Sequence, residues 1–184
     1  MPVATQHLLY VPMPLTGDAW VLGVLKDCEA VSVPHLPKYS PFSLIPGSWL
    51  TDRVAFGSVR DPWSWYRALW QTISVNPNGQ VLLRHLGQGS TAFPAFLRGV
   101  TNPSVWLTAP DRFTSRFWDW PSGVDDGLYT ATFKALYDTA VEGLVDYAQL
   151  EAGLTESLGT PVPGFQADTF DYTAETQAIV TQAD

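Results

Sequence analysis

Three polar side chains in the first half of the sequence have a spacing that could bind an anion. Residues Arg53–Val59 have the alternation of a strand, and Asp61 followed by a proline predicts the start of a helix. Counted from Arg60, Ser64 and Arg67 stand at i+4 and i+7, so the three side chains would share one helix face. Because the N-terminus of a helix attracts negative charge, this pattern predicts a phosphate-binding face. The alternative is a solvated helix face with Arg60 paired to Asp61.

A second candidate lies near the N-terminus, in the segment Pro14–Trp20 (PLTGDAW), after a predicted strand over His7–Val11 and before a predicted helix. A loop that cradles phosphate needs a glycine for close backbone approach, a hydroxyl group and, in most cases, a lysine. Thr16 and Gly17 meet the first two needs, whereas the lysine is absent and Asp18 would repel a phosphate. The segment therefore predicts either a partial anion site or a tight turn.

The rest of the chain must position these two junctions, and its patterns predict alternating strands and helices. Further short strands are expected at Ala30–Val33 and Leu144–Tyr147. Helices are expected over residues 63–74, 93–100, 128–137, 150–158 and 173–181. Residues 34–46 hold four prolines and predict an ordered loop. This alternation indicates an α/β fold, with a small parallel sheet flanked by helices, in a single domain over residues 1–184.

Composition places the chain among packed globular proteins. At 184 residues, a single core needs neither disulfides nor a structural metal. Apolar residues make up 46% and charged residues 15%, a balance that excludes a long disordered chain. The single cysteine, Cys28, cannot form an intramolecular disulfide, and no Cys/His cluster has the spacing of zinc ligands. We therefore expect no metal site.

Charge argues against some partners and favours others. The formal net charge of −8 argues against general binding to nucleic acid, whose phosphates would repel the chain. Residues 1–100 hold seven basic and five acidic side chains, whereas residues 101–184 hold three basic and thirteen acidic ones. An anionic ligand is therefore expected on the N-terminal half.

No segment of the sequence predicts contact with a membrane. The apolar run Ala19–Leu25 is interrupted by Gly23 and is far shorter than the about 20 residues of a membrane span. A secretory signal would place a basic segment before its apolar run, yet the first basic residue is Lys26. We therefore expect no membrane partner and a cytoplasmic location.

Two longer segments keep the order of strand, loop and helix: HLLYVPMPLTGDAWVLGVL (residues 7–25) and FGSVRDPWSWYRALW (residues 56–70). They resemble the phosphosulfate loop region and the second motif of sulfotransferases of the carbohydrate and phage-encoded type. HLPKYSPFSLIP (residues 35–46) is similar to that family's histidine-containing loop, and the likeness in order continues to residue 180. The resemblance implies a P-loop-like fold. It also implies, for active members, transfer of a sulfuryl group from phosphoadenosine phosphosulfate to a hydroxyl or amine, with no metal.

The family's donor-binding positions carry over to this sequence one at a time. The arginine that grips the 3′-phosphate is retained as Arg60, and the loop's threonine and glycine are retained as Thr16 and Gly17. His35 matches the family histidine often considered a general base. The lysine of the first motif, however, falls on Leu15.

Two further donor contacts of the family are absent. The serine eight residues after Arg60 is Ala68, and the intervening arginine is Trp65. Ser64 and Arg67 could restore part of the anion binding from the same helix face. Losing one preorganised positive donor typically costs about 10²–10³ in rate, so the missing lysine argues against sulfuryl transfer.

One hypothesis is a non-catalytic sulfotransferase-like domain, without a cofactor, that is reused for contacts with protein partners or with its own copies. The eight tryptophans favour it, because aromatic side chains dominate contact hot spots. The segment Arg116–Pro121 (RFWDWP) is expected to be half exposed and available to a partner. Similar sequences occur in phage genomes, so a virion accessory protein at the head or the head-to-tail junction is one concrete form.

The competing hypothesis is an active sulfotransferase with a remodelled donor site. Arg60, Ser64 and Arg67 would then hold the phosphates of phosphoadenosine phosphosulfate, Thr16 would bind the sulfonate end, and His35 would act as the base. A third hypothesis, a small-molecule binder of another class, rests only on the proline-rich loop 34–46.

Overall fold

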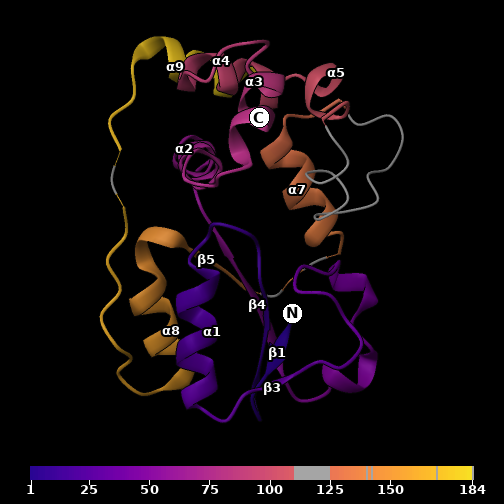
Figure 1. Ribbon diagram of the computed structural model, residues 1–184. Coiled ribbons are helices and arrows are strands. Elements are labelled where there is room, and N and C mark those ends of the chain that lie inside the picture. Colours follow the sequence, from indigo (N-terminus) through magenta and orange to yellow (C-terminus); the bar gives the residue numbers. More distant parts are fainter. Residues whose placement is uncertain (110–124, 140, 142, 169, 184) are drawn as a thin grey trace. The chain divides into compact units, whose positions relative to one another are not determined.

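The computed structural model divides the chain into two compact units (Figure 1). The first unit comprises Met1–Arg60 and Leu136–Asp168, and the second comprises Asp61–Ala135 and Thr169–Asp184. The structure describes residues 1–109, 125–139, 141, 143–168 and 170–183. The chain passes from the first unit to the second directly after Arg60. One domain over residues 1–184 stays a prediction.

A five-stranded mixed sheet forms the centre of the first unit. Its strand order is β3 (Val31–Ser32), β1 (Val3–Ala4), β2 (Leu8–Val11), β4 (Val54–Val59) and β5 (Gly143–Asp146). Strands β2, β4 and β5 pair in parallel, whereas β1 pairs antiparallel with both β2 and β3. The predicted α/β class is confirmed, but a wholly parallel sheet is wrong at the β1–β3 edge. β1 has two residues, too few to show an alternating pattern in the sequence.

Alternation along the strands gives the sheet two apolar faces. Leu8, Tyr10 and Phe56 point to one face, where α1 (Asp18–Asp27) and α8 (Leu150–Leu158) cover them. Figure 1 shows these two helices side by side on that face. Apolar side chains of the two helices and of this sheet face therefore form one hydrophobic cluster of the first unit.

The opposite face of the sheet is covered by the proline-rich loop. Leu9, Val11 and Ala55 pack there against side chains from residues 33–50. The loop forms two short 3₁₀ helices, η1 (Phe42–Leu44) and η2 (Gly47–Trp49), because its prolines deny it a longer helix.

Helices make up the second unit within the described residues. They are α2 (Pro62–Ser74), α3 (Gly79–Leu86), α4 (Phe93–Val100), α5 (Pro103–Trp106), α7 (Leu128–Leu136, all but its last residue) and α9 (Ala174–Ala183). α4 lies at their centre and contacts α2, α3, α5 and α9. Gly99 of α4 allows a close approach to α3, because a Cβ there would lie 1.7 Å from the carbonyl oxygen of Leu86.

The predicted helices agree with the observed ones except at α3 and α5. The N-cap of α2 is Asp61, whose carboxylate accepts a hydrogen bond of 2.8 Å from the backbone nitrogen of Ser64. α3 is not predicted because an Asn-Pro-Asn-Gly turn precedes it and glycines follow it, which leaves only a short apolar stripe between turn signals. In the described part of the chain, no helix has the length and apolar character needed to span a membrane.

Candidate functional site

The loop after β2 turns sharply at the carboxyl ends of the parallel strands. Gly17 is the N-cap of α1 and has a φ of 79°. A Cβ on Gly17 would lie 2.4 Å from Cδ1 of Leu150, so both space and backbone conformation require glycine. Leu15 also has a positive φ, 65°, which costs a residue with a side chain about 1–2 kcal/mol. Other contacts must therefore hold the loop in place.

A chain of buried hydroxyl groups lies beneath this loop. Oγ1 of Thr16 donates to the carbonyl oxygen of Met13 at 2.8 Å and lies 2.7 Å from Oγ of Ser58. The Ser58 oxygen in turn lies 2.7 Å from the hydroxyl of Tyr10. Each hydroxyl has one proton, so the protons run from Tyr10 to Ser58, from Ser58 to Thr16 and from Thr16 to Met13. The Thr16 hydroxyl predicted to meet a ligand thus donates its proton inside the core.

Burial keeps this chain in its neutral form. The side chains of Tyr10, Ser58 and Thr16 are fully buried. Burial, with the neighbouring Tyr137 adding to it, raises the pKa of Tyr10 well above its usual range. Tyr10 therefore stays protonated and remains the first donor of the chain.

Tyr137 closes the loop from the other side of the sheet. Its hydroxyl lies 3.1 Å from the carbonyl oxygen of Val11 and 3.2 Å from that of Ser58, and it shares its one proton between these two acceptors. The phenol lies directly on Gly57 of β4, where a Cβ would be 2.4 Å from the Tyr137 hydroxyl oxygen. The carboxyl ends of β2 and β4 are therefore joined by one side chain.

Arg60, the predicted phosphate-gripping residue, is buried at the end of β4, with 3% of its surface exposed. Its Nη1 donates to the carbonyl oxygen of Leu15 at 3.2 Å, and its guanidinium carbon lies 4.0 Å from the centroid of the Tyr147 ring. Nη2 lies 3.8 Å from Oδ2 of Asp168. We call these four residues, Arg60, Leu15, Tyr147 and Asp168, the Arg60 cradle. The protein's own carbonyl, aromatic face and carboxylate surround the charge.

Residues 161–168, which follow α8, supply part of this cradle and are called the closing segment. The ring of Phe165 packs 4.9 Å from that of Trp20 and 5.1 Å from that of Tyr147, measured between centroids. Its backbone nitrogen donates to Oε2 of Glu151 at 2.8 Å, and Asp168 accepts a hydrogen bond from the Tyr147 hydroxyl at 3.3 Å. An aromatic ring and a carboxylate thus lie beside Tyr147, which contacts Arg60.

Tyr147 itself is a neutral phenol in this arrangement. Burial raises its pKa above the usual range, although the positive charge of Arg60 opposes the rise. The hydroxyl therefore keeps its proton and donates it to Asp168, and the ring presents its face to the guanidinium.

A lysine does lie at the first turn of α1, but it comes from the proline-rich loop. Nζ of Lys38 is 2.7 Å from Oδ2 of Asp18, and the Tyr39 hydroxyl donates to the same carboxylate at 3.1 Å. Burial alone would lower the pKa of Lys38, but hydrogen bonds to Asp18 and Tyr39 and the charge of Asp18 raise it. Asp18, expected to repel a phosphate, is thus compensated by a protonated lysine.

Ser64 and Arg67 belong to the second unit and have partners there. The Ser64 hydroxyl donates to the carboxylate of Asp61, the N-cap of its own helix. The guanidinium carbon of Arg67 lies 4.8 Å from the ring centroids of both Trp70 and Phe93. Asp61 therefore occupies the anion position at the start of α2, and Arg67 lies on aromatic rings.

His35, the predicted base, lies on an exposed turn with a φ of 65°. β1 is antiparallel to both β2 and β3, so β2 and β3 run in the same direction and their carboxyl ends lie at the same end of the sheet. The turn that carries His35 follows β3 at that end, as the loop with Thr16 follows β2. β1 separates β3 from β2, so those two strands lie about 10 Å apart. The structure thus brings Thr16, Gly17 and Arg60 together around one loop and places His35 at the end of a strand two positions away in the sheet.

Sequence reasoning missed the residues that fill the cradle. Tyr147, Phe165 and Asp168 stand in segments predicted only as a strand end and a connector. One weak signal was present, because the aromatic Phe165 directly follows the Pro/Gly-rich stretch Pro161–Gly164 and a large aromatic side chain favours packing. No group of three or more His, Cys, Asp or Glu within the described ranges could hold a metal ion.

The tryptophans are divided between the core and its margin. Trp65 and Trp106 are buried, whereas the others in the described ranges are half-buried, namely Trp20, Trp49, Trp63 and Trp70. The predicted half-exposed segment Arg116–Pro121 lies outside the described residues.

No protein-family model matches the chain, and no curated protein matches it. The resemblance to sulfotransferases therefore rests on the residues and their order.

Proposed function

We propose that this chain is a non-catalytic sulfotransferase-like domain of P-loop-like fold that works through contacts with other proteins or with its own copies. The arrangement of the first unit supports the fold part of the proposal. Gly17 and Arg60 stand after β2 and β4, two adjacent parallel strands, at the edge where α/β folds bind anions.

The observation that carries the proposal is the filled Arg60 cradle. The guanidinium already meets the Leu15 carbonyl, the Tyr147 face and the Asp168 carboxylate. Sulfuryl transfer needs preorganised positive charge at the migrating group, and Leu15 stands where the resemblance expects a lysine. The contacts of the cradle therefore stabilise the first unit, and a different part of the surface carries the proposed function.

Contact with proteins is the function that the aromatic and apolar side chains at the surface support. Four half-buried tryptophans lie at the margin of the core, where aromatic side chains form contact hot spots. Val75, at the end of α2, is 84% exposed and Val81 of α3 is 71% exposed, so the second unit also presents apolar groups to solvent. A phage virion accessory protein, at the head or the head-to-tail junction, is the form that the resemblance suggests.

The alternative is an active sulfotransferase with a remodelled donor site, and one observation favours it. Lys38 places an ammonium group at the first turn of α1, 2.7 Å from Asp18, where it could replace the missing lysine. His35 would accept the proton of the acceptor hydroxyl, and adenosine 3′,5′-bisphosphate would leave with the electrons of the broken oxygen–sulfur bond.

Calorimetry with adenosine 3′,5′-bisphosphate separates the two functions. We expect no binding by the whole chain and no radiolabelled transfer from phosphoadenosine phosphosulfate to any hydroxyl or amine acceptor. Micromolar binding that is lost in Arg60→Ala would overturn the non-catalytic function. Because Arg60→Ala removes a buried side chain, Arg60→Lys is the second variant, and its unfolding midpoint shows whether a loss of binding reflects the site or the fold.

Sedimentation velocity over about a hundredfold range of concentration tests the contact function. We expect the weight-average mass to rise above the 20.3 kDa of one chain as concentration increases. A mass that stays at one chain throughout would leave a different protein as the required partner.

A further inference from the structure

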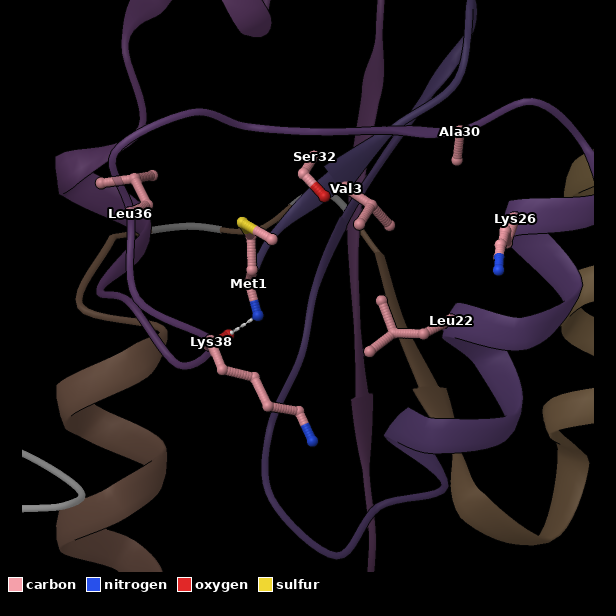
Figure 2. Close-up of a pocket in the computed structure, with 8 residues that line it drawn as sticks. All are labelled: Met1, Val3, Leu22, Lys26, Ala30, Ser32, Leu36 and Lys38. Carbon is pink, nitrogen blue, oxygen red and sulfur yellow. Dashed lines mark hydrogen bonds between the residues drawn. The ribbon is translucent and has the colours of Figure 1, made fainter.

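The first unit contains an open pocket of about 610 Å³ that shares no lining residue with the Arg60 cradle. Its walls come from the N-terminal residue, the sheet edge, α1 and the proline-rich loop (Figure 2). The lining residues are Met1, Val3, Leu22, Lys26, Ala30, Ser32, Leu36 and Lys38. The volume falls within the about 300–1,000 Å³ typical of ligand pockets. The pocket lies at the β3–β1 end of the sheet, where both strands have only two residues.

One face of α1 forms the length of this pocket. Asp18, Leu22 and Lys26 follow at intervals of four residues, so they lie in a row along the helix. From Asp18 to Lys26 the helix rises about 12 Å. Lys38 is held at the Asp18 end by its ion pair, and Lys26 lies at the other end, in the last turn. Lys26 and the Lys38–Asp18 pair therefore lie at opposite ends of α1, and both lysines line the pocket.

Most of the pocket's lining is apolar and backed by the core, and its polar groups besides the lysines are the Met1 amine and the Ser32 hydroxyl. Val3, Leu22 and Ala30 pack against the cluster beneath α1 and α8, and Leu36 packs against the cluster on the other face of the sheet. Figure 2 shows Val3 and Leu22 directed toward the space between α1 and the loop that carries Leu36 and Lys38. An aliphatic body of a ligand would replace water on these side chains, which is favourable.

The two lysines differ in charge compensation. Asp18, which is itself buried, neutralises Lys38 at 2.7 Å. Lys26 makes no ion pair with any residue that the structure describes, and the acidic neighbours that follow it, Asp27 and Glu29, are not among the lining residues. The α-amino group of Met1, the third nitrogen in the lining, donates to the carbonyl oxygen of Lys38, and burial together with the charge of Lys38 lowers its pKa to about 5, so it carries little charge at pH 7. Lys26 is therefore the group in the pocket at which a bound negative charge gains most.

We propose that this pocket binds a medium-chain aliphatic carboxylate, with its carboxylate at Lys26 and its chain along Leu22 toward Lys38. One uncompensated ammonium group fits one carboxylate, and the apolar walls fit an unbranched chain better than a phosphate, which needs several donors. The proposal gives a role to the proline-rich loop and does not depend on the proposed function.

The test is a ¹H–¹⁵N NMR titration of the whole chain with octanoate below its micelle concentration. We expect saturable shifts at the amides of Val3, Leu22 and Ala30, with a Kd of about 1 mM or tighter. Butyrate, four methylene groups shorter, should bind at least about tenfold more weakly. Octyltrimethylammonium, of like chain and opposite charge, should also bind at least about fivefold more weakly. Equal affinity for octanoate and the ammonium compound would overturn the proposal, as would shifts centred outside the pocket.

Three variants locate the carboxylate and the chain. Lys26→Met keeps the aliphatic stem and should weaken octanoate about three- to fivefold, whereas the control Lys134→Met in the second unit should leave the affinity unchanged. Ala30→Phe should fill the pocket and abolish the shifts while amide dispersion shows an intact fold. Lys38→Met should weaken binding less than Lys26→Met does; the reverse order would overturn the assignment of the carboxylate to Lys26.

Discussion

Two cationic places in the first unit differ in what surrounds the charge. At the Arg60 cradle the guanidinium is buried, and a carbonyl, an aromatic face and a carboxylate of the same chain compensate it. At the pocket beside α1, Lys26 is exposed and its neighbouring walls are apolar. Water compensates an exposed ammonium group, whereas a buried guanidinium must be compensated by the protein.

This difference in burial explains why Arg60, which stands in a recognisable motif, is less accessible to a ligand than Lys26, which stands in none. A motif arginine at a strand end indicates anion binding, yet here the buried guanidinium already has a carbonyl bond to Leu15, the face of Tyr147 and, at 3.8 Å, the carboxylate of Asp168 beside it. Lys26 stands in no motif and keeps its charge available to a ligand. The location of a charge that only water compensates, rather than the motif, points to the proposed binding surface.

The largest effect should come from adding one methyl group beneath the cradle loop, in Gly57→Ala. The new Cβ would lie 2.4 Å from the Tyr137 hydroxyl oxygen, so the ring must move and lose its bonds to Val11 and Ser58. We expect a loss of about 2–3 kcal/mol in the free energy of unfolding, measured by denaturant titration. Gly47→Ala is the control, because nothing lies within 4 Å of its Cβ position. Equal losses in the two variants would show that Tyr137 does not close the loop.

Breaking the buried hydroxyl chain should have the next largest effect. Ser58→Ala leaves the Tyr10 hydroxyl without its acceptor and removes the donor to Thr16, so we expect a loss of about 2 kcal/mol in the free energy of unfolding. The matched control is Ser74→Ala, whose hydroxyl donates only to the carbonyl oxygen of Trp70 one turn earlier in α2. A loss in Ser58→Ala no larger than that in Ser74→Ala would mean that the chain does not hold the loop.

Much of the fold could be predicted because local patterns determine it. The proline after Asp61 marks the start of α2, and the apolar spacing over Phe93–Val100 and Leu150–Leu158 gives helices with those same bounds. The mixed character of the sheet could not be predicted, since a two-residue strand such as β1 is defined by its partners and not by its own sequence.

The candidate site was only partly predictable for a similar reason. Arg60, Thr16 and Gly17 stand in recognisable spacings, but their burial and partners depend on segments about 45 to 110 residues away along the chain, as with Ser58 and Asp168. Asp18 shows the same limit: its charge predicts repulsion of an anion until Lys38 is placed beside it. Long-range contacts of this kind leave no periodic trace in a sequence.

Removing side chains beside Arg60 and Tyr147 should make the Arg60 guanidinium accessible to an added anion. In the double variant Phe165→Ala and Asp168→Ala, the Arg60 guanidinium loses its carboxylate and Tyr147 loses its aromatic neighbour. We expect adenosine 3′,5′-bisphosphate to cause saturable shifts in an NMR titration of the variant, with a Kd of about 1 mM or tighter, where the wild-type chain shows none. The control pair Phe165→Ala and Asp171→Ala removes the same net charge outside the cradle. A gain of equal size in that control would assign the effect to overall charge.

The smallest effect should come from the ion pair that compensates Lys38. Lys38 is half exposed, so Lys38→Met should cost at most about 1 kcal/mol in the free energy of unfolding, and added salt should shrink the difference because exposed charges are screened. Asp18 has only 10% of its side chain exposed, but the Tyr39 hydroxyl and its place in the first turn of α1 still stabilise its charge. Lys134→Met, which breaks a more exposed pair with Asp126, is the control and should cost less. A cost well above about 1 kcal/mol that salt leaves unchanged would mean that the pair behaves as a buried ion pair, because removing one partner would then leave the other without compensation.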